Sequence, residues 1–126
     1  MRNFRNLQIW TKSITLAKEI YLLTGKFPGS EKFGITSQIQ RAAVSIASNI
    51  AEGTSRKSQN DFIRFLEMSL GSAYEVETQL VIAKEIGYLT NEQYNNQMVE
   101  LTILQKQINQ LISTIRKNQK PKTKNQ

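Results

Sequence analysis

The residues that could do chemistry gather in one stretch, RAAVSIASNIAEG, at residues 41–53. Ser45, Ser48, Asn49 and Glu52 are spaced through its small apolar residues. A serine nucleophile needs a neighbouring base, and the chain contains no His, the residue that most often supplies one. The spacing therefore favours a helix-packing surface over a catalytic site.

The composition excludes several other kinds of site. The 126 residues include no Cys and no His, which removes disulfides, thiolate chemistry and an ordinary zinc site. A carboxylate di-metal site in a helical bundle normally uses Glu-x-x-His pairs, and these are absent as well. We therefore expect no metal, no cofactor and no enzymatic activity.

The sequence also lacks the signals of export and of membrane insertion. Its start, MRNFRNLQIW, has no continuous apolar stretch of the kind found in a signal peptide. The most apolar region, residues 62–83, is interrupted by Arg64, Glu67, Glu75 and Glu77. These observations predict a cytoplasmic protein without membrane contact.

The net charge of +7 is unevenly distributed along the chain. Residues 1–115 carry a net charge of only +2, and the last eleven residues contain no acid. A basic tail favours a polyanionic partner, and the alternative is a solvated end that improves solubility. The five basic residues of this end are Arg116, Lys117, Lys120, Lys122 and Lys124.

Apolar periodicity and turn residues predict four helices, at about residues 7–24, 37–53, 59–86 and 91–116. No segment shows the strict alternation of a strand, and the connections are short. Helices joined in this way pack antiparallel to their neighbours, which predicts an up-down-up-down antiparallel four-helix bundle at residues 1–116. Residues 117–126 have no apolar side chain and are expected to form a disordered basic tail.

Local signals refine these helices. Three N-terminal capping pairs are predicted, at Ser37 with Gln40, Ser58 with Asp61, and Thr90 with Gln93. Gly87 fits the position just after the third helix. In the first helix, the expected inward stripe consists of Trp10, Ile14, Ala17 and Tyr21.

The second helix has an unusual outer side. Its apolar side faces the core, but the flanks of its polar side carry small apolar residues where a water-exposed helix would carry Lys and Glu. A single chain of four helices leaves this side uncovered, so we expect a second copy of the chain to cover it. The predicted oligomer interface consists of Arg41, Ser45, Ala47, Ser48, Asn49 and Glu52.

The segments FRNLQIWTKS, FPGSEKFGITSQIQRAAVSIASNIAEG, FIRFLEMSLGSAYEVETQL and AKEIGYLT, in this order, closely resemble the bacterial family of 23S rRNA intervening-sequence proteins. The resemblance covers about residues 4–115. The most specific part is SIASNIAEG followed by RFLEMSLGSAYEVETQL. One departure is Ala47, where many members are expected to have Pro.

The resemblance implies more than the periodicity does. It implies a four-helix bundle that assembles as a ring, typically a homopentamer, without enzymatic activity. Some members are encoded within sequences that interrupt ribosomal RNA genes. A related branch is similar to the accessory proteins of diversity-generating retroelements, so RNA, DNA and a reverse transcriptase are the implied partners.

Two functions remain open at this point. The first is an oligomeric protein that binds nucleic acid through phosphate contacts, and the alternative is a protein-binding scaffold whose basic residues only maintain solubility. A salt-dependent affinity for RNA would separate them. The residues expected to contact phosphate are Arg2, Arg5, Arg56, Lys57, Arg64, Lys117, Lys120, Lys122 and Lys124.

Overall fold

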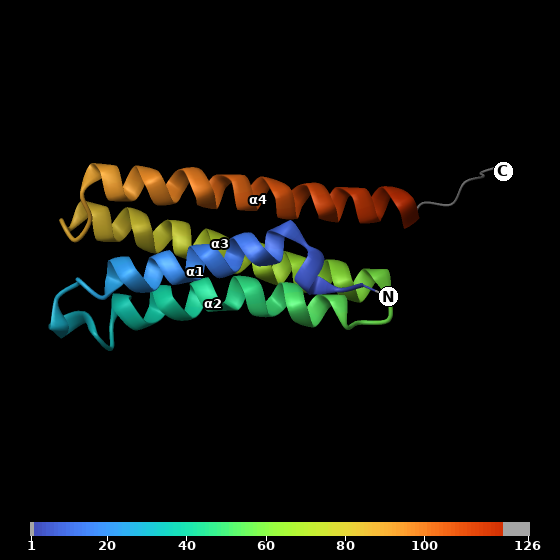
Figure 1. The fold of residues 1–126 in the computed structure, drawn as a ribbon, viewed down its shortest axis with the longest axis horizontal. Coiled ribbons are helices and arrows are strands. Elements are labelled where there is room, and N and C mark those ends of the chain that lie inside the picture. The colour runs from blue at the N-terminus through green and yellow to red at the C-terminus, as the bar shows by residue number, and fades with distance from the viewer. Residues whose placement is uncertain (1, 120–126) are drawn as a thin grey trace.

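The computed structural model describes residues 2–119, and this part of the chain is all-α with no strand. The four long helices are α1 (Gln8–Thr24), α2 (Ile35–Thr54), α3 (Gln59–Glu85) and α4 (Asn91–Gln119). They run up, down, up and down along one long axis (Figure 1). A short 3-10 helix, η1 (Phe4–Asn6), precedes α1, and a second one, η2 (Gly29–Glu31), lies in the α1–α2 connection. The predicted all-α four-helix fold is confirmed.

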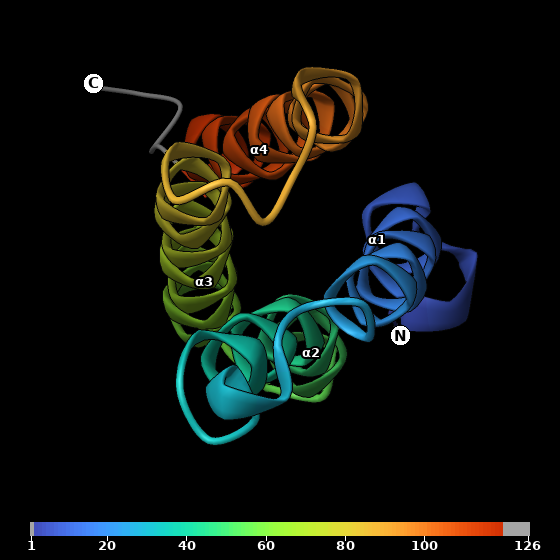
Figure 2. The same cartoon turned by 90° about the vertical axis from the view of Figure 1, so that its left-hand side faces the viewer.

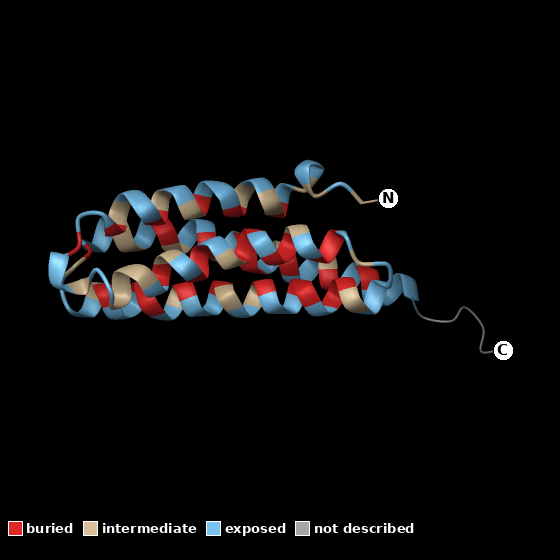
Figure 3. Cartoon of the chain, turned by 90° about the horizontal axis from the view of Figure 1, so that it is seen from below, coloured by how far each residue is buried: buried red, intermediate tan, exposed pale blue. Residues whose placement is uncertain are grey.

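The helices are neighbours in the order of the chain. Seen along the bundle, α2 lies between α1 and α3, and α4 lies beside α3 (Figure 2). The contact between α1 and α4 is the least extensive of the four neighbouring pairs. Buried positions recur along the inward side of every helix (Figure 3). The largest fully buried apolar side chains are Ile20, Ile39, Ile46, Ile50, Leu66, Val76, Leu80, Leu101, Leu104 and Ile108.

Two predicted caps are confirmed. The Ser58 hydroxyl accepts a hydrogen bond from the Asp61 backbone N–H at 3.0 Å. Thr90 and Gln93 form a reciprocal capping box, in which each side chain accepts from the other's backbone N–H, at 3.0 and 2.9 Å. Gly87 also has its expected role, because its φ of +88° lies in the left-handed region that favours glycine.

The predicted cap at Ser37 is wrong. Helix α2 begins earlier, at Ile35, with Gly34 as its N-cap. Ser37 lies in the first turn and its hydroxyl donates to the Gly34 carbonyl at 3.2 Å. The carboxylate of Glu31 reaches the Ile35 N–H at 3.5 Å, so a residue from the preceding 3-10 helix supplies the acceptor at this end.

The predicted inward stripe of α1 is wrong for Ile14 and Tyr21, whereas Trp10 and Ala17 are partly buried against the core. The buried side chains are those of Ile9, Ser13, Leu16 and Ile20, each one position before the predicted stripe. Ile14 and Tyr21 are 45% and 48% exposed. The predicted residues and the buried residues both have helical spacing. The buried set contains a serine, so the sequence shows it as the less apolar of the two. Ser13 can be buried because its hydroxyl donates to the Trp10 carbonyl at 2.7 Å.

Helix α4 continues beyond its predicted end. The helix includes Lys117 and ends at Gln119, whose side-chain amide donates to Asn60 Oδ1 at 3.0 Å. The boundary predicted at residue 117 therefore falls inside the helix. Lys120, Lys122 and Lys124 lie outside the described residues. Of the helices described, none is long and apolar enough to cross a membrane.

Candidate nucleic-acid interface

Most of the predicted phosphate-binding residues lie at one end of the bundle. The N-terminal segment, the α2–α3 turn and the last turns of α4 meet there (Figure 1). We call residues 2–5, 52–67 and 116–119 the basic end. It carries seven basic and three acidic side chains, a net charge of +4, whereas the other described residues carry seven of each and are neutral. The basic side chains are Arg2, Arg5, Arg56, Lys57, Arg64, Arg116 and Lys117.

Four of these side chains line one open groove. The groove lies between the N-terminal segment and the α2–α3 turn, and its lining includes Ala51. Arg2 and Arg5 line it from the N-terminal side, and Arg56 and Lys57 line it from the turn. The structure thus brings together residues that are about fifty positions apart in the sequence.

Arg2 is held by the chain itself. Its guanidinium donates to the Arg56 carbonyl at 2.8 Å and to the Thr54 carbonyl at 3.4 Å, and it also donates to the side chain of Gln59. It lies 4.3 Å from the centre of the Phe62 ring. The last carbonyls of a helix have no partner within the helix and form the negative end of its dipole. Arg2 therefore fastens the N-terminal segment to the end of α2, which leaves its guanidinium less available to a phosphate.

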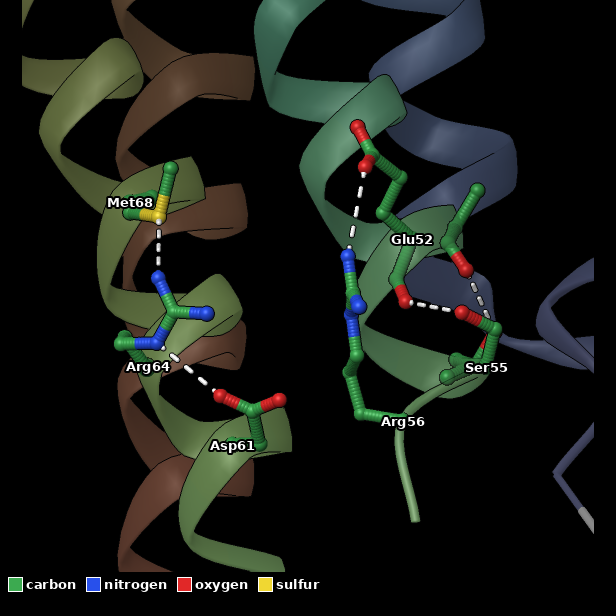
Figure 4. Close-up of polar contacts among 8 residues, drawn as sticks. Glu52, Ser55, Arg56, Asp61, Arg64 and Met68 are labelled. Atoms are coloured by element: carbon green, nitrogen blue, oxygen red, sulfur yellow. Dashed lines mark hydrogen bonds and ion pairs between the residues drawn. The ribbon is translucent and has the colours of Figure 1, made fainter. Parts of the chain in front are cut away.

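Arg56 and Arg64 flank one aromatic ring. Their guanidinium carbons lie 4.5 and 4.7 Å from the centre of the Phe65 ring, so the two cations are near neighbours. Asp61 accepts from Arg64 Nε at 3.0 Å, and Glu52 lies 3.7 Å from Arg56 Nη2 (Figure 4). The side chains of Arg56 and Arg64 remain 40% and 57% exposed. Both keep donor groups that an anion can approach.

The remaining basic residues differ in how far they are paired. Arg116 forms a 2.7 Å ion pair with Glu67, which fixes the end of α4 against α3. Arg5 lies 4.4 Å from the Phe4 ring and is exposed. Lys57, in the α2–α3 turn, and Lys117, in the last turn of α4, are exposed too.

The polar residues threaded through α2 form a seam with α3. The hydroxyls of Ser45 and Ser72 are 2.9 Å apart and hydrogen bonded. The Asn49 amide donates to the Ser45 carbonyl at 3.0 Å and to its hydroxyl at 2.9 Å. One turn away, the Ser69 hydroxyl donates to the Ile46 carbonyl at 2.8 Å. Ser45, Ser69 and Ser72 are thus hydrogen bonded to one another, to Asn49 or to backbone, and they join α2 to α3.

This seam bears on the predicted oligomer interface. Asn49 is 9% exposed and Ala47 is 5% exposed, so one chain already covers both. The expectation that a single chain leaves this flank open is wrong for these two residues, because α1 and α3 lie on either side of α2. Arg41, Ser48 and Glu52 are exposed on the outer side of α2, and their role in assembly stays a prediction.

Two exposed apolar surfaces were not predicted from the sequence. The first, the α1–α2 surface, carries Ile14 and Tyr21 on α1 and Val44 on α2. These residues belong together because Gln40, one turn before Val44, donates to Thr24 Oγ1, one turn after Tyr21, at 3.0 Å. The second, the α3 surface, consists of Tyr74, Thr78, Val81 and Ile82, which line a shallow pocket together with Glu77. The sequence did contain a signal for these surfaces, because apolar residues recur at helical spacing on more than one side of a helix.

The fold and the basic end define a class: a four-helix protein whose positive charge is concentrated at one end. No group of three or more His, Cys, Asp or Glu that could hold a metal occurs in the described part of the chain. Residues 5–110 match the family described as 23S rRNA-intervening sequence protein, and the chain belongs to this family. The sequence-based resemblance is thereby confirmed.

A solved structure agrees with this assignment. It is the crystal structure of a protein with unknown function from the S23 ribosomal protein family of Bacteroides thetaiotaomicron. The two chains are 31% identical, with a TM-score of 0.77 over 82% of this chain and 97% of the other. Among curated proteins, the comparison finds no match.

Proposed function

We propose that the protein binds nucleic acid through the phosphate groups of the backbone, and that the basic end is the contact surface. The observation that carries this proposal is the charge distribution: a net charge of +4 at one end of an otherwise neutral bundle. Charge concentrated on one surface attracts a polyanion more strongly than the same charge spread evenly. Lys120, Lys122 and Lys124 follow α4 directly in the sequence and carry three further positive charges.

The phosphate contacts are assigned first to Arg56, Lys57 and Arg64. Guanidinium groups present planar sets of N–H donors that match phosphate oxygens. Arg56 is the less tightly paired of the two arginines beside Phe65, because its ion pair with Glu52 is long, at 3.7 Å, and Arg64 is the more exposed of the two. Phosphate contacts give affinity without base sequence readout. We therefore expect binding that depends strongly on salt and weakly on sequence.

The same proposal includes self-assembly. A closed ring needs two different surfaces that fit each other, one on each side of the subunit. The α1–α2 surface and the α3 surface are two apolar patches on different helices, and this supports the proposal. A pentamer is the assembly that the family resemblance implies, and a ring with parallel subunits would gather the basic ends on one rim.

The experiment that tests the proposal is a salt series. A fluorescein-labelled single-stranded RNA is titrated with the protein and with Arg56→Ala/Lys57→Ala, and affinity is read by anisotropy. The slope of log affinity against log salt should become shallower by about 0.7 for each phosphate of a single strand that the variant no longer neutralises. Lys12→Ala/Lys106→Ala, away from the basic end, is the matched control and should leave the slope unchanged. If the intact protein has no RNA or DNA affinity at low salt, the alternative of a protein-binding scaffold replaces this proposal.

A further inference from the structure

The open groove at the basic end contains an aromatic ring as well as positive charge. Its volume is about 1100 Å³, slightly above the range of about 300–1,000 Å³ for pockets that hold drug-sized ligands. Of the described residues that line it, four are basic, none is acidic, and one, Phe4, is aromatic. Phosphate groups need no aromatic ring, so Phe4 indicates that another part of a ligand can enter the groove.

Phe4 and Arg5 present two planar groups side by side in this groove. The Phe4 ring is only partly buried, and it meets the Trp10 ring at 65° with the ring centres 5.0 Å apart. The Arg5 guanidinium lies over the Phe4 ring, 4.4 Å from its centre, and Arg5 is exposed. A guanidinium is itself planar and stacks on flat partners. We call Phe4 and Arg5 the stacking pair.

The combination of planar groups with cations indicates which form of nucleic acid fits. Unpaired bases stack on aromatic rings and on arginine guanidinium planes. In a duplex the faces of each base are covered by the neighbouring base pairs, so a base must leave the stack before it can lie on a protein ring. A positively charged groove with an aromatic side chain is the arrangement that binds single strands.

We infer that the groove takes a single-stranded segment of nucleic acid. One unpaired base stacks on Phe4 and Arg5, and the adjoining phosphates contact Arg56 and Lys57 across the groove. This inference rests on the proposed function and specifies the form of nucleic acid that the same site takes.

The polar side chains of the groove give little means of reading a base. The Thr54 hydroxyl donates to the Ala51 carbonyl and the Ser55 hydroxyl to the Glu52 carbonyl, both at 2.7 Å. Both hydroxyl hydrogens are therefore used within α2 and its end. Since every base has a face that can stack, we expect the groove to accept any unpaired base.

The preference for a single strand opposes the one that charge alone would give. A duplex carries roughly twice the charge of one strand per unit length, so simple phosphate attraction favours the duplex. The test therefore compares three fluorescein-labelled ligands of about twelve nucleotides, which lies within the usual size of a single-strand site. They are a thymidine strand, the same strand annealed to its complement, and an abasic strand that keeps the phosphates and lacks the bases. We expect the intact protein to bind the thymidine strand more tightly than either of the others.

Variants of Phe4 separate stacking from charge. Phe4→Leu keeps an apolar side chain beside Trp10 and should bind the thymidine strand at least about fivefold more weakly, as expected when one base loses its aromatic partner. Its affinity for the abasic strand and its salt slope should be unchanged, because no charge is removed. Phe4→Tyr keeps the ring and should bind like the wild type. Phe33→Ala removes an 87% exposed ring from the α1–α2 connection, at the opposite end of the bundle, and is the matched control.

Two kinds of failure can be told apart. Tighter binding of the duplex, equal binding of the thymidine and abasic strands, or wild-type affinity of Phe4→Leu would overturn this inference and leave phosphate binding by the basic end in place. No affinity for any of the three ligands at low salt would remove the proposed function, and this inference with it. The comparison of the three ligands uses the unaltered protein, so it does not depend on how a variant folds.

Discussion

The Ser45 hydroxyl on α2 and the Ser72 hydroxyl on α3 are hydrogen bonded at 2.9 Å, across the most extensive helix contact of the bundle. The small residues that could have surrounded a nucleophile instead let two helices approach closely. Gly53 lies at a close approach between the two helices, because a Cβ there would lie 2.8 Å from Phe65 Cβ. The small residues of 41–53 therefore serve helix packing, and the closeness of this packing can be tested by adding single methyl groups.

Gly53→Ala should destabilise the protein. The added methyl group has no room beside Phe65 and Phe62, and overpacking of this kind costs about 1–3 kcal/mol. Gly71→Ala on α3 is the matched control, because nothing lies within 4 Å of its added Cβ. It should stabilise the helix by about 0.5–1 kcal/mol through the lower conformational entropy of alanine in the unfolded chain. Urea denaturation followed by circular dichroism measures both, and equal effects of the two changes would contradict the close packing.

Ser48→Glu should weaken self-assembly and leave the fold intact. Ser48 is exposed on the outer side of α2, so the added carboxylate does not enter the core. Ala47→Glu, one residue earlier, should instead unfold the chain, because Ala47 is 5% exposed and a buried unpaired charge costs several kcal/mol. Light scattering and circular dichroism separate the two effects. A wild-type mass equal to the 14.4 kDa monomer would remove the assembly proposal, and Ser113→Glu on α4 controls for added charge.

The α1–α2 connection should depend on pH through Tyr88, because the Tyr88 hydroxyl donates to Glu31 Oε2 in that connection. Its hydrogen bond to Glu31, some desolvation and the Glu31 charge raise the pKa of the Tyr88 hydroxyl above its ordinary value of 10.0. A raised pKa means that the bond's contribution to stability is complete below pH 10 and is lost as pH rises through the pKa of the folded protein. In an ultraviolet titration, Tyr88→Phe should therefore lose a tyrosinate component that forms above pH 10. A titration curve in which Tyr88→Phe loses an early component would contradict the hydrogen bond.

The sequence predicted the fold well because helix ends and helix periodicity are local. Ser58, Thr90, Gln93 and Gly87 act through their immediate neighbours, and each has the predicted role. The orientation of a helix is not local. In α1 two stripes one residue apart were both possible, and the buried one contains Ser13, whose hydrogen bond within the helix is invisible in a hydropathy pattern.

The candidate site could be predicted only as a set of charges. Nothing in the sequence shows that the Arg2 guanidinium binds the carbonyls of Thr54 and Arg56, or that Arg56 and Arg64 share the Phe65 ring. These are contacts between segments, set by where the helices end. Burial is set in the same way. Asn49 was predicted to border the outer side of α2 as part of an oligomer interface, and it is buried within the single chain.

Removal of residues 120–126 should preserve the fold and weaken nucleic-acid binding. The cut leaves α4 complete through Gln119, including its hydrogen bond to Asn60 and the ion pair between Arg116 and Glu67. It removes three lysines, Lys120, Lys122 and Lys124, and no acid or apolar residue. The melting temperature should therefore match that of the full chain.

The slope of log RNA affinity against log salt should become shallower by about 0.7 for each lysine that contacts a phosphate of a single strand. The change is therefore up to about 2 if all three lysines make such a contact. A full-length variant with the three lysines changed to glutamine is the matched control for chain length, and it should reproduce the truncation. Arg56→Ala/Lys57→Ala in the truncated chain should reduce the slope further, because the turn and the residues after α4 then act as separate parts of one surface. If the slope of the truncated protein equals that of the full chain, these lysines only improve solubility, and the phosphate contacts lie on the bundle alone.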